Sequence, residues 1–351
     1  MVRKSVRSLQ GNETLAKPVM TWDYQMVLPE GAKIKKDYID RLEELGILEV
    51  FIKEEEQFGT NEIAILKSDI ENNIKEKVKD ILERHTYHKN EELMKLSQMA
   101  DNIITSIMEE EQVIEKVYDI KERSTDIYEH SLSTCSMSIL TALKLDVPKS
   151  RIHDIGVGCL LHDLGLRYTT INFGEKDIQS LNSQEMIEFK KHPVYGYSAI
   201  QNEGWISDIS KAIILYHHER LDGSGFPLHT KKIPLEAQIV NVCDAFDEMI
   251  CGITDKQIKV YEAVEYLKVM SGTLFNPKIV ETFLSFTAVY PAGSRVRTSE
   301  GEIALVISQN NEFQDRPVLR ILKDKNGNAI KEEVVKDMLK IPSLFITEVF
   351  D

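Results

Sequence analysis

The spacing of apolar residues divides the chain into four stretches. Residues 1–60 alternate short apolar runs with turn signals around Pro18, Pro29 and Gly31, which predicts a small β-rich module. Within it, residues 38–45 carry apolar side chains at helical spacing up to Gly46, and residues 48–52 are typical of a strand. Residues 290–351 return to alternating runs and turns, which predicts a second small β-rich module.

Between residues 61 and 120 a charged, amphipathic helical pattern dominates. Apolar residues recur every three or four positions from Ile70 to Val117, with an interruption at residues 84–90. Such a face is a packing surface, either for the next domain or for a second copy of the chain, so a homodimer is one expected assembly. His85 and His88 lie in the interruption among Lys and Asn and are predicted to be solvated.

Residues 121–289 are predicted to be mostly helical. The predicted fold class is therefore mainly α: an all-helical domain at 121–289, preceded by a helical linker or packing segment at 61–120. The β-rich modules at 1–60 and 290–351 flank this helical part.

Composition limits the location and the partners. The 351 residues, 42% hydrophobic and 28% charged, are typical of a soluble globular protein of two or three domains. We find no signal sequence and no apolar run near 18 residues, so we expect a cytoplasmic protein without membrane insertion. The formal charge of −14 argues against duplex DNA as a partner, while a small anionic ligand stays compatible if metal ions supply positive charge. The cysteines are predicted to be reduced core residues: Cys135, Cys159, Cys243 and Cys251.

The most informative stretch is residues 215–227, where His217 and His218 end an apolar run. A turn rich in Asp, Gly, Ser and Pro follows at once and cannot continue the helix. Adjacent helical residues point about 100° apart, so the two side chains reach neighbouring but distinct points. Two metal ions would suit that geometry. The alternative is one packed and one exposed histidine.

Further titratable residues fall at the ends of apolar helices or within them. Burying so many without a ligand would be costly, and coordination offsets that cost. Mixed imidazole and carboxylate ligands suit Fe, Mn, Zn or Ni rather than Mg or Ca. The residues concerned are His130, His162, Asp163, His192, His217, His218 and Asp244.

The adjacent His162-Asp163 resembles the pair that defines the HD metal-dependent phosphohydrolase superfamily. Residues 217–227 are similar to the signature of its HD-GYP subfamily, with Phe226 in place of the usual Tyr. The resemblance covers about residues 121–289. It implies an all-helical phosphodiesterase that hydrolyses the bacterial second messenger cyclic di-GMP to linear pGpG and, on further hydrolysis, to GMP.

Carried over motif by motif, the resemblance makes the seven residues named above the ligands of two divalent transition-metal ions, Fe or Mn. Asp163 becomes the catalytic residue that bridges the metals and holds the nucleophile. Asp126 stands where some family members have a glutamate that recruits a third metal, and its alternative role is to cap the helix that carries His130. His153 and His229 match nothing in the family and are interpreted as structural or surface residues. The implied substrate contacts are Asp222, Gly225 and Lys256.

Three departures from the family pattern concern the substrate. Leu166 occupies the position of a lysine that lies near the substrate phosphate, with Arg167 next to it. The usual Lys-Pro-Gly segment is absent from residues 168–181, and Ile253 replaces an arginine that contacts the ligand. These departures keep two alternatives open: the same chemistry on another cyclic dinucleotide, or a slow or inactive nucleotide-sensing signalling module.

Overall fold

The computed structural model describes residues 2–9, 11, 13–21, 26–53, 60–84, 91–110, 112–123, 126–171, 178–311, 313–330 and 332–350. The chain forms two compact units. One comprises Glu62–Pro291 with Gln309–Pro317, and the other comprises Met1–Asn61, Ala292–Ser308 and Val318–Asp351. Among the helices described, none is long and apolar enough to cross a membrane.

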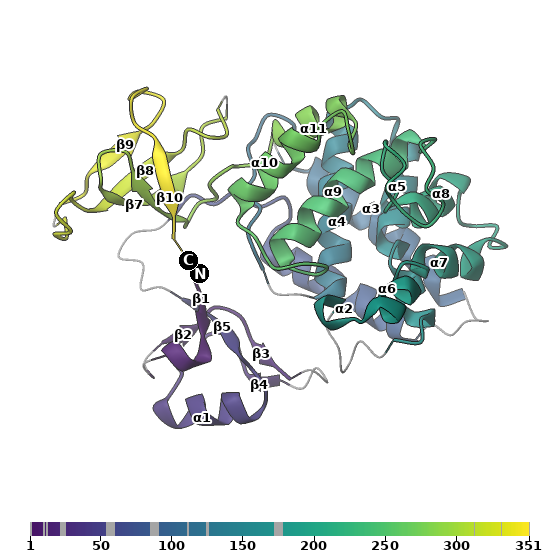
Figure 1. Cartoon of the computed structure of the whole chain (residues 1–351), viewed down its shortest axis with the longest axis horizontal. Coiled ribbons are helices and arrows are strands. Elements are labelled where there is room, and N and C mark those ends of the chain that lie inside the picture. The colour runs from purple at the N-terminus through teal and green to yellow at the C-terminus, as the bar shows by residue number, and fades with distance from the viewer. Residues whose placement is uncertain are drawn as a thin grey trace. The chain divides into compact units, whose positions relative to one another are not determined.

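The first unit is helical and appears in blue, teal and green in Figure 1. Short 3-10 helices connect some of its α-helices at Glu91–Met94, Leu164–Tyr168 (η3) and Ile178–Ser180. The α-helices are α2 (Ser68–Arg84), α3 (Lys95–Met108), α4 (Ile127–Lys144), α5 (Lys149–Leu161), α6 (Ser183–Phe189), α7 (His192–Ile200), α8 (Asp208–Tyr216), α9 (Leu235–Cys251), α10 (Val260–Met270) and α11 (Pro277–Leu284).

Helices α4 and α9 form the centre of this unit. Residues 128–142 of α4 are all buried, as are most residues of α9, and a helix buried on every side belongs in the interior of a domain. Helix α9 begins after Pro234 and ends at Gly252, whose φ of 69° provides the left-handed cap. Because α4 packs against both α5 and α9, it brings His130 close to Asp244.

Helices α2 and α3 share the same core. Val78 of α2 and Leu96 and Ile103 of α3 are fully buried in one apolar cluster with residues of α4, α5 and α9. Their apolar faces therefore pack against the helical domain, which was one of the two expected arrangements. A homodimer stays a prediction, without support from these faces.

Helix α3 is shorter than the sequence pattern predicted. It ends at Met108, residues 112–115 form turns, and Gln112 has a φ of 54°, so the helix expected to continue to Val117 is wrong. A run of glutamates follows Met108 in the sequence, and negative side chains at a helix C-terminus oppose the helix dipole. His85 and His88 lie outside the described residues.

The Ser-Gln-Glu sequence at residues 183–185 predicts one helix that is capped by Ser183 and carries His192, but two helices form here. Helix α6 ends at Phe189, and its cap is Asn182 rather than Ser183: the Asn182 side chain accepts the N–H groups of Gln184 and Glu185. His192 instead begins α7, because Pro193 favours the first turn of a new helix over the interior of a continuing one. This break places His192 at a helix N-terminus.

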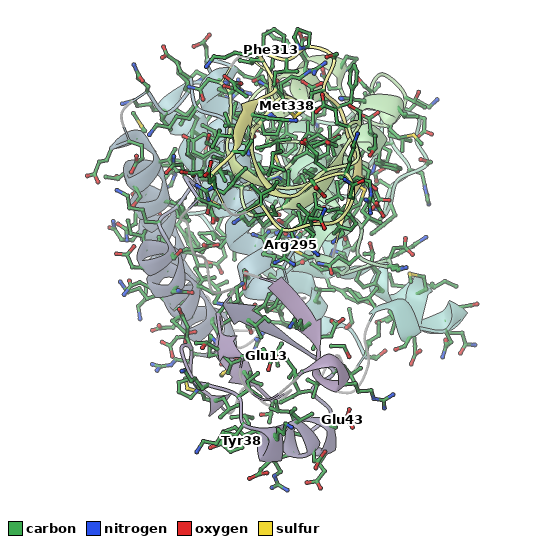
Figure 2. The ribbon with its side chains drawn as sticks, turned by 90° about the vertical axis from the view of Figure 1, so that its left-hand side faces the viewer. Glu13, Tyr38, Glu43, Arg295, Phe313 and Met338 are labelled. Carbon is green, nitrogen blue, oxygen red and sulfur yellow. The ribbon has the colours of Figure 1, made fainter. Side chains whose placement is uncertain are left out.

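The β-rich parts are small and antiparallel. Near the N-terminus, β1 (Val2–Ser5), β5 (Glu49–Lys53) and β2 (Thr14–Leu15) form a sheet in that order, and β3 (Val19–Met20) pairs with β4 (Met26–Leu28). Helix α1 (Lys36–Glu44) buries Leu42, while its Tyr38 and Glu43 are labelled in Figure 2.

The C-terminal sheet has the order β10-β6-β7-β8-β9 and buries Met338, also labelled in Figure 2. Strands β1, β2 and β9 were not predicted, because runs so short carry little periodicity. The predicted class, a helical domain with small β-rich parts at both ends, is confirmed. The strands of the C-terminal sheet are β6 (Arg295–Thr298), β7 (Ile303–Ser308), β8 (Val318–Lys323), β9 (Val335–Asp337) and β10 (Ile346–Val349).

Candidate metal centre

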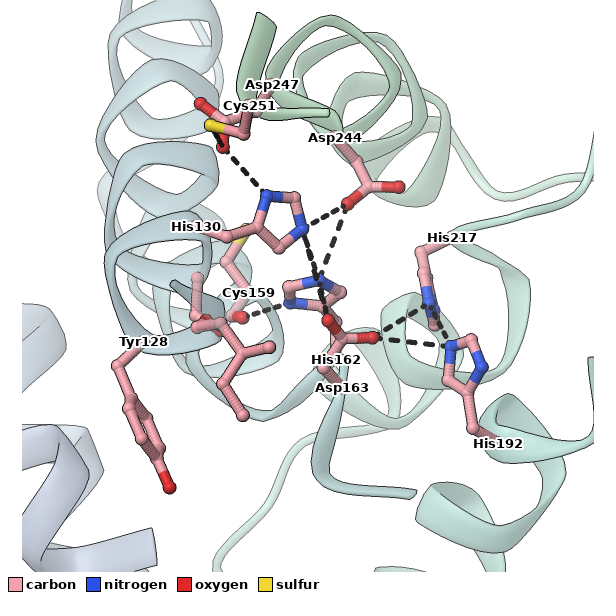
Figure 3. A network of polar contacts seen from close by, with 12 residues as sticks. Tyr128, His130, Cys159, His162, Asp163, His192, His217, Asp244, Asp247 and Cys251 are labelled. Carbon is pink, nitrogen blue, oxygen red and sulfur yellow. Dashed lines mark hydrogen bonds and ion pairs between the residues drawn. The ribbon is translucent and has the colours of Figure 1, made fainter. Parts of the chain in front are cut away.

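Side chains from five helices of the first unit converge on one buried point (Figure 3). His162 and His217 are the residues that directly follow α5 and α8, and His192 is the first residue of α7. Each of these helices therefore ends or begins at the site, so its terminal histidine points inward. His130 of α4 and Asp244 of α9 approach from within the two central helices, and both are buried.

Three of the histidines are oriented by the main chain of the residues just before them. Nδ1 lies 2.6 Å from the Cys159 carbonyl oxygen in His162, 2.9 Å from that of Phe189 in His192, and 2.9 Å from that of Ile214 in His217. A ring nitrogen that faces a carbonyl carries the proton, so Nε2 of the same ring presents a lone pair. All three Nε2 atoms are thereby set as acceptors.

His130 is oriented by a side chain instead. Its Nδ1 lies 2.8 Å from Oδ2 of Asp247, whose other oxygen, Oδ1, accepts a hydrogen bond from the buried Arg123. The thiol of Cys251 donates to the same Oδ2 at 3.5 Å. This arrangement leaves Nε2 of His130 directed at Asp244, 3.1 Å from its Oδ1.

The Asp163 carboxylate joins two groups of histidines. Its Oδ2 lies 3.3 Å from Nε2 of His162 and 4.0 Å from Nε2 of His130. Its Oδ1 lies 3.3 Å from Nε2 of His192 and 3.9 Å from Nε2 of His217. One carboxylate thus faces a different pair of imidazoles with each oxygen.

These donors fit two divalent transition-metal ions. One group able to hold an ion is His130, His162 and Asp244, and another is Asp163, His192, His217 and His218. Within them Nε2 of His192 lies 3.0 Å from Nε2 of His217, and Nε2 of His162 lies 3.3 Å from that of His130. Lone pairs that face one another in a buried site are unfavourable, and a cation relieves them. Imidazole with carboxylate is a donor set that suits Fe, Mn or Zn.

The pKa values differ between the two groups. Burial lowers the pKa of His217 to about 3, and burial also lowers the pKa values of His192 and His218, so these imidazoles are neutral, as metal ligands are. Burial alone would lower the pKa of His162 too, but the Asp163 carboxylate raises it well above its usual value. A positive charge beside Asp163 is therefore strongly favoured.

The segment after the histidine pair is held against the backbone of that pair. The buried Glu219 carboxylate accepts the N–H groups of Leu228 at 2.6 Å and Thr230 at 3.0 Å. A Cβ on Gly225 would lie 2.4 Å from the His218 carbonyl oxygen, so only glycine allows this approach. As a result the Phe226 ring stacks on His218, with ring centroids 4.5 Å apart.

The structure thus brings together the seven residues predicted as ligands. Asp126 is not in either group: its Oδ1 accepts the N–H groups of Tyr128 and Glu129 and caps α4, as the alternative interpretation expected. Its role as a third-metal ligand stays a prediction. His153 contacts Ser97 through Nε2 at 3.0 Å and His229 is exposed, and both lie apart from the two groups. The four cysteines are buried and free, as predicted.

The structure places the predicted substrate contacts outside the two ligand groups. Gly225 is buried against the backbone of His218, Asp222 accepts the Ser224 N–H within an exposed turn, and Lys256 is exposed. Substrate contact by these three residues stays a prediction.

The departures from the family pattern have clear positions in the structure. Leu166 and Ile253 are only 8% and 6% exposed and belong to the core. Arg167 donates to the Glu83 carbonyl, 3.3 Å away. It therefore points away from the metal centre.

Two acidic residues of α9 were missed as site residues. Asp247 follows Asp244 by three positions, which predicts that the two side chains share a helix face. Its hydrogen bonds with His130 and Arg123 join residues more than a hundred positions apart, so no local pattern indicates them. Glu248 follows Asp244 by four positions and forms a further group with His218 and Asp244. Only the helical spacing could have indicated them from the sequence.

Comparison with known proteins agrees with this site. Residues 111–279 match the family described as HD domain, and residues 295–351 match a KOW domain associated with HD domain. The chain is 26% identical over 244 residues to a cyclic di-GMP phosphodiesterase of Pseudomonas aeruginosa, covering 68% of this chain and 58% of that protein. It is 34% identical over 149 residues to the cyclic di-GMP phosphodiesterase response regulator RpfG of Xanthomonas campestris, covering 41% of this chain and 39% of that protein. The chain thus spans less than two thirds of the length of either relative.

A solved structure shares the fold. The HD-GYP-type protein Bd1817 from Bdellovibrio bacteriovorus superposes with a TM-score of 0.53 at 20% sequence identity, covering 80% of this chain and 97% of that one. The His162-Asp163 pair and residues 217–227, which carry the resemblance, lie within the matched HD region. His162, Asp163, His217 and His218 belong to the groups that could hold metal ions. Residues 111–279 therefore form an HD domain, as the His162-Asp163 pair indicated.

Proposed function

We propose that the chain is a metal-dependent phosphodiesterase that hydrolyses cyclic di-GMP to linear pGpG. The observation that carries this proposal is the position of Asp163, whose two oxygens face two separate groups of imidazole nitrogens. A carboxylate that spans two ligand groups is the arrangement of a two-metal hydrolytic site. The names of both curated relatives support the choice of substrate.

The residues have distinct parts in this proposal. His130, His162 and Asp244 would hold one ion, His192, His217 and His218 would hold the other, and Asp163 lies beside both groups. When bound, two such ions, iron or manganese, activate water and neutralise charge on a phosphodiester. The Nδ1 hydrogen bonds of four histidines direct Nε2 of each ring toward the centre, and the buried position of the rings excludes bulk water.

The described residues supply little positive charge near this centre. Leu166 and Ile253 are apolar core residues, and Arg220 donates to the carbonyl oxygens of His217 and Glu219. The exposed Lys190 lies with its ammonium 5.6 Å from the centroid of the Phe226 ring, which stacks on His218. A cation that contacts a phosphate in the transition state strongly accelerates hydrolysis, so we expect slow turnover of cyclic di-GMP.

A second candidate is the same chemistry on a different cyclic dinucleotide. The observation that favours it is the burial of Leu166 and Ile253, since neither side chain can contact a phosphate or guanine as a cation would. Substrate contact by Asp222, Gly225 and Lys256 belongs to either version. A slow signalling module that binds nucleotide is the remaining alternative.

The test is an assay of the full chain, purified anaerobically with its metals retained, against a panel of cyclic dinucleotides. Products are identified by chromatography. We expect pGpG from cyclic di-GMP, and no product from the double variant His162→Ala with Asp163→Ala. His153→Ala is the matched control, because it removes a histidine of α5 that lies outside both ligand groups, and it should retain full activity.

Two outcomes would overturn this proposal. Less than one equivalent of metal per chain in the wild type would contradict the metal centre. Hydrolysis of another cyclic dinucleotide with none of cyclic di-GMP would leave the chemistry in place and replace the substrate.

A further inference from the structure

A third group of possible metal ligands shares Asp244 and His218 with the two groups described above. His218, Asp244 and Glu248 each offer a donor atom, and these atoms lie within 4.8 Å of one another. Asp244 and Glu248 are four residues apart on α9, so their carboxylates project from the same face of the helix. Glu248 belongs to neither group described above.

The two oxygens of Asp244 are in different situations. Oδ1 lies 3.1 Å from Nε2 of His130 and 3.4 Å from Nε2 of His162. Oδ2 is buried without a hydrogen-bond partner and lies 3.7 Å from Nδ1 of His218. A buried acceptor without a partner is costly and rare in folded proteins, so this oxygen indicates a missing ligand.

Glu248 adds a second carboxylate to the same point. Within the described part of the chain its side chain has no hydrogen bond or ion pair, although it lies beside the ionised Asp244. Arg220 acts on this carboxylate through its charge, but its Nη1 donates to the carbonyl oxygens of His217 and Glu219. Two carboxylates on one helix face, with an imidazole beside them, form a donor set that a divalent cation can bind.

We propose that His218, Asp244 and Glu248 form a third divalent-cation site, adjoining the group of His130, His162 and Asp244. Asp244 joins these two groups through its two oxygens, as Asp163 joins the two groups of the proposed catalytic centre. One imidazole and two carboxylates suit Mn²⁺ or Fe²⁺. The proposal rests on the proposed function only in that Asp244 and His218 also serve the catalytic ions.

This site differs from the third site that Asp126 would provide. The Asp126 Oδ1 atom is used by two N–H groups at the start of α4, and its Oδ2 lies 3.8 Å from the ammonium of Lys75. Asp126 therefore already has partners, whereas the described residues give the Glu248 side chain no hydrogen bond or ion pair. A third cation is therefore expected at Glu248 and not at Asp126.

The experiment counts Mn²⁺ ions bound by the full chain after treatment with a chelator, using the electron paramagnetic resonance signal of free Mn²⁺. We expect the wild type to bind one ion more than Glu248→Gln, a nearly isosteric change that removes the charge. Asp126→Asn should bind as many ions as the wild type, because asparagine also caps helices. Glu265→Gln is the matched control, since Glu265 is an exposed glutamate of α10 that pairs with Lys268.

Each outcome decides the question. Equal binding by wild type and Glu248→Gln, or only two ions in the wild type, overturns the third site. Loss of an ion in Asp126→Asn alone would place the third cation at Asp126. Fewer than two ions in the wild type would instead refute the proposed function. Circular dichroism checks folding, and Glu248→Asp, which withdraws the carboxylate by one methylene, repeats the comparison if Glu248→Gln does not fold.

Discussion

His217 and His130 present the same ring nitrogen to the metal centre but are held there in different ways. Nδ1 of His217 faces a main-chain carbonyl three residues earlier in the chain, as do the corresponding atoms of His162 and His192. Nδ1 of His130 faces Asp247, which itself depends on Arg123. A carbonyl is present whatever the side chain of the residue that carries it. The orientation of His130, in contrast, depends on particular side chains, so its half of the centre should be the more sensitive to substitution.

Removal of metal affects both halves and should have the largest effect. An ion that binds only the folded state at 100 times its dissociation constant stabilises it by about 2.7 kcal/mol. We therefore expect the chelated protein to melt several degrees below the metal-loaded protein in calorimetry. The double variant His162→Ala with Asp163→Ala should lose most of this difference. Equal melting temperatures with and without metal would contradict binding in either half.

Asp247→Asn should weaken only the half that contains His130. The amide can still face Nδ1, but it removes the negative charge that holds Arg123 and polarises the imidazole. Loss of such a partner typically lowers metal affinity or activity by about 10- to 100-fold. Competition with a chelator of known affinity measures the change. An unaltered affinity would show that His130 does not need its side-chain partner.

Ile214→Val is the corresponding change in the other half. It shortens a fully buried side chain but retains the carbonyl that orients His217. We expect a loss of about 0.5–1.5 kcal/mol in the free energy of unfolding, measured by urea denaturation, with no change in metal affinity. A tenfold loss of affinity would mean that main-chain support is as sensitive as side-chain support.

Asp126→Asn should have the smallest effect. Because asparagine caps helices about as well as aspartate, we expect a change of no more than a few tenths of a kcal/mol in the free energy of unfolding. Asp126→Ala should destabilise by about 1 kcal/mol, since it leaves the N–H groups of Tyr128 and Glu129 without their acceptor. Equal effects of the two substitutions would show that the cap contributes little to the stability of α4.

The sequence predicted which side chains would come together in the two groups, because most of them lie where an apolar run stops. His162 and His217 follow such runs directly, and the turn-forming residues after His218 mark the end of a helix. The apolar periodicity of α2 and α3 predicted which side of each helix is buried, but not which elements that side packs against. That choice depends on contacts with α4 and α5, far along the chain.

Other features could not be predicted from local pattern. The role of Asp247 requires Arg123, 124 positions away, and the unpartnered oxygen of Asp244 appears only once α4, α5 and α9 are packed. The predicted helix through Val117 was wrong because the spacing of apolar residues carries no information on charges at the C-terminus of a helix or on the positive φ of Gln112. The division of the helix before His192 depended on Pro193, a signal present in the sequence.

Gly165, two residues after Asp163, has a consequence for the interpretation of mutational data. A Cβ there would lie 1.8 Å from the carbonyl oxygen of His192, so η3 and α7 approach each other backbone to backbone. Any side chain at this position would collide with the backbone of His192 and so separate the Asp163 carboxylate from the His192 imidazole. In a saturation screen scored by activity, Gly165 should therefore appear as intolerant as the histidines, although it carries no functional group. A screen of that kind alone would misassign it to the chemistry.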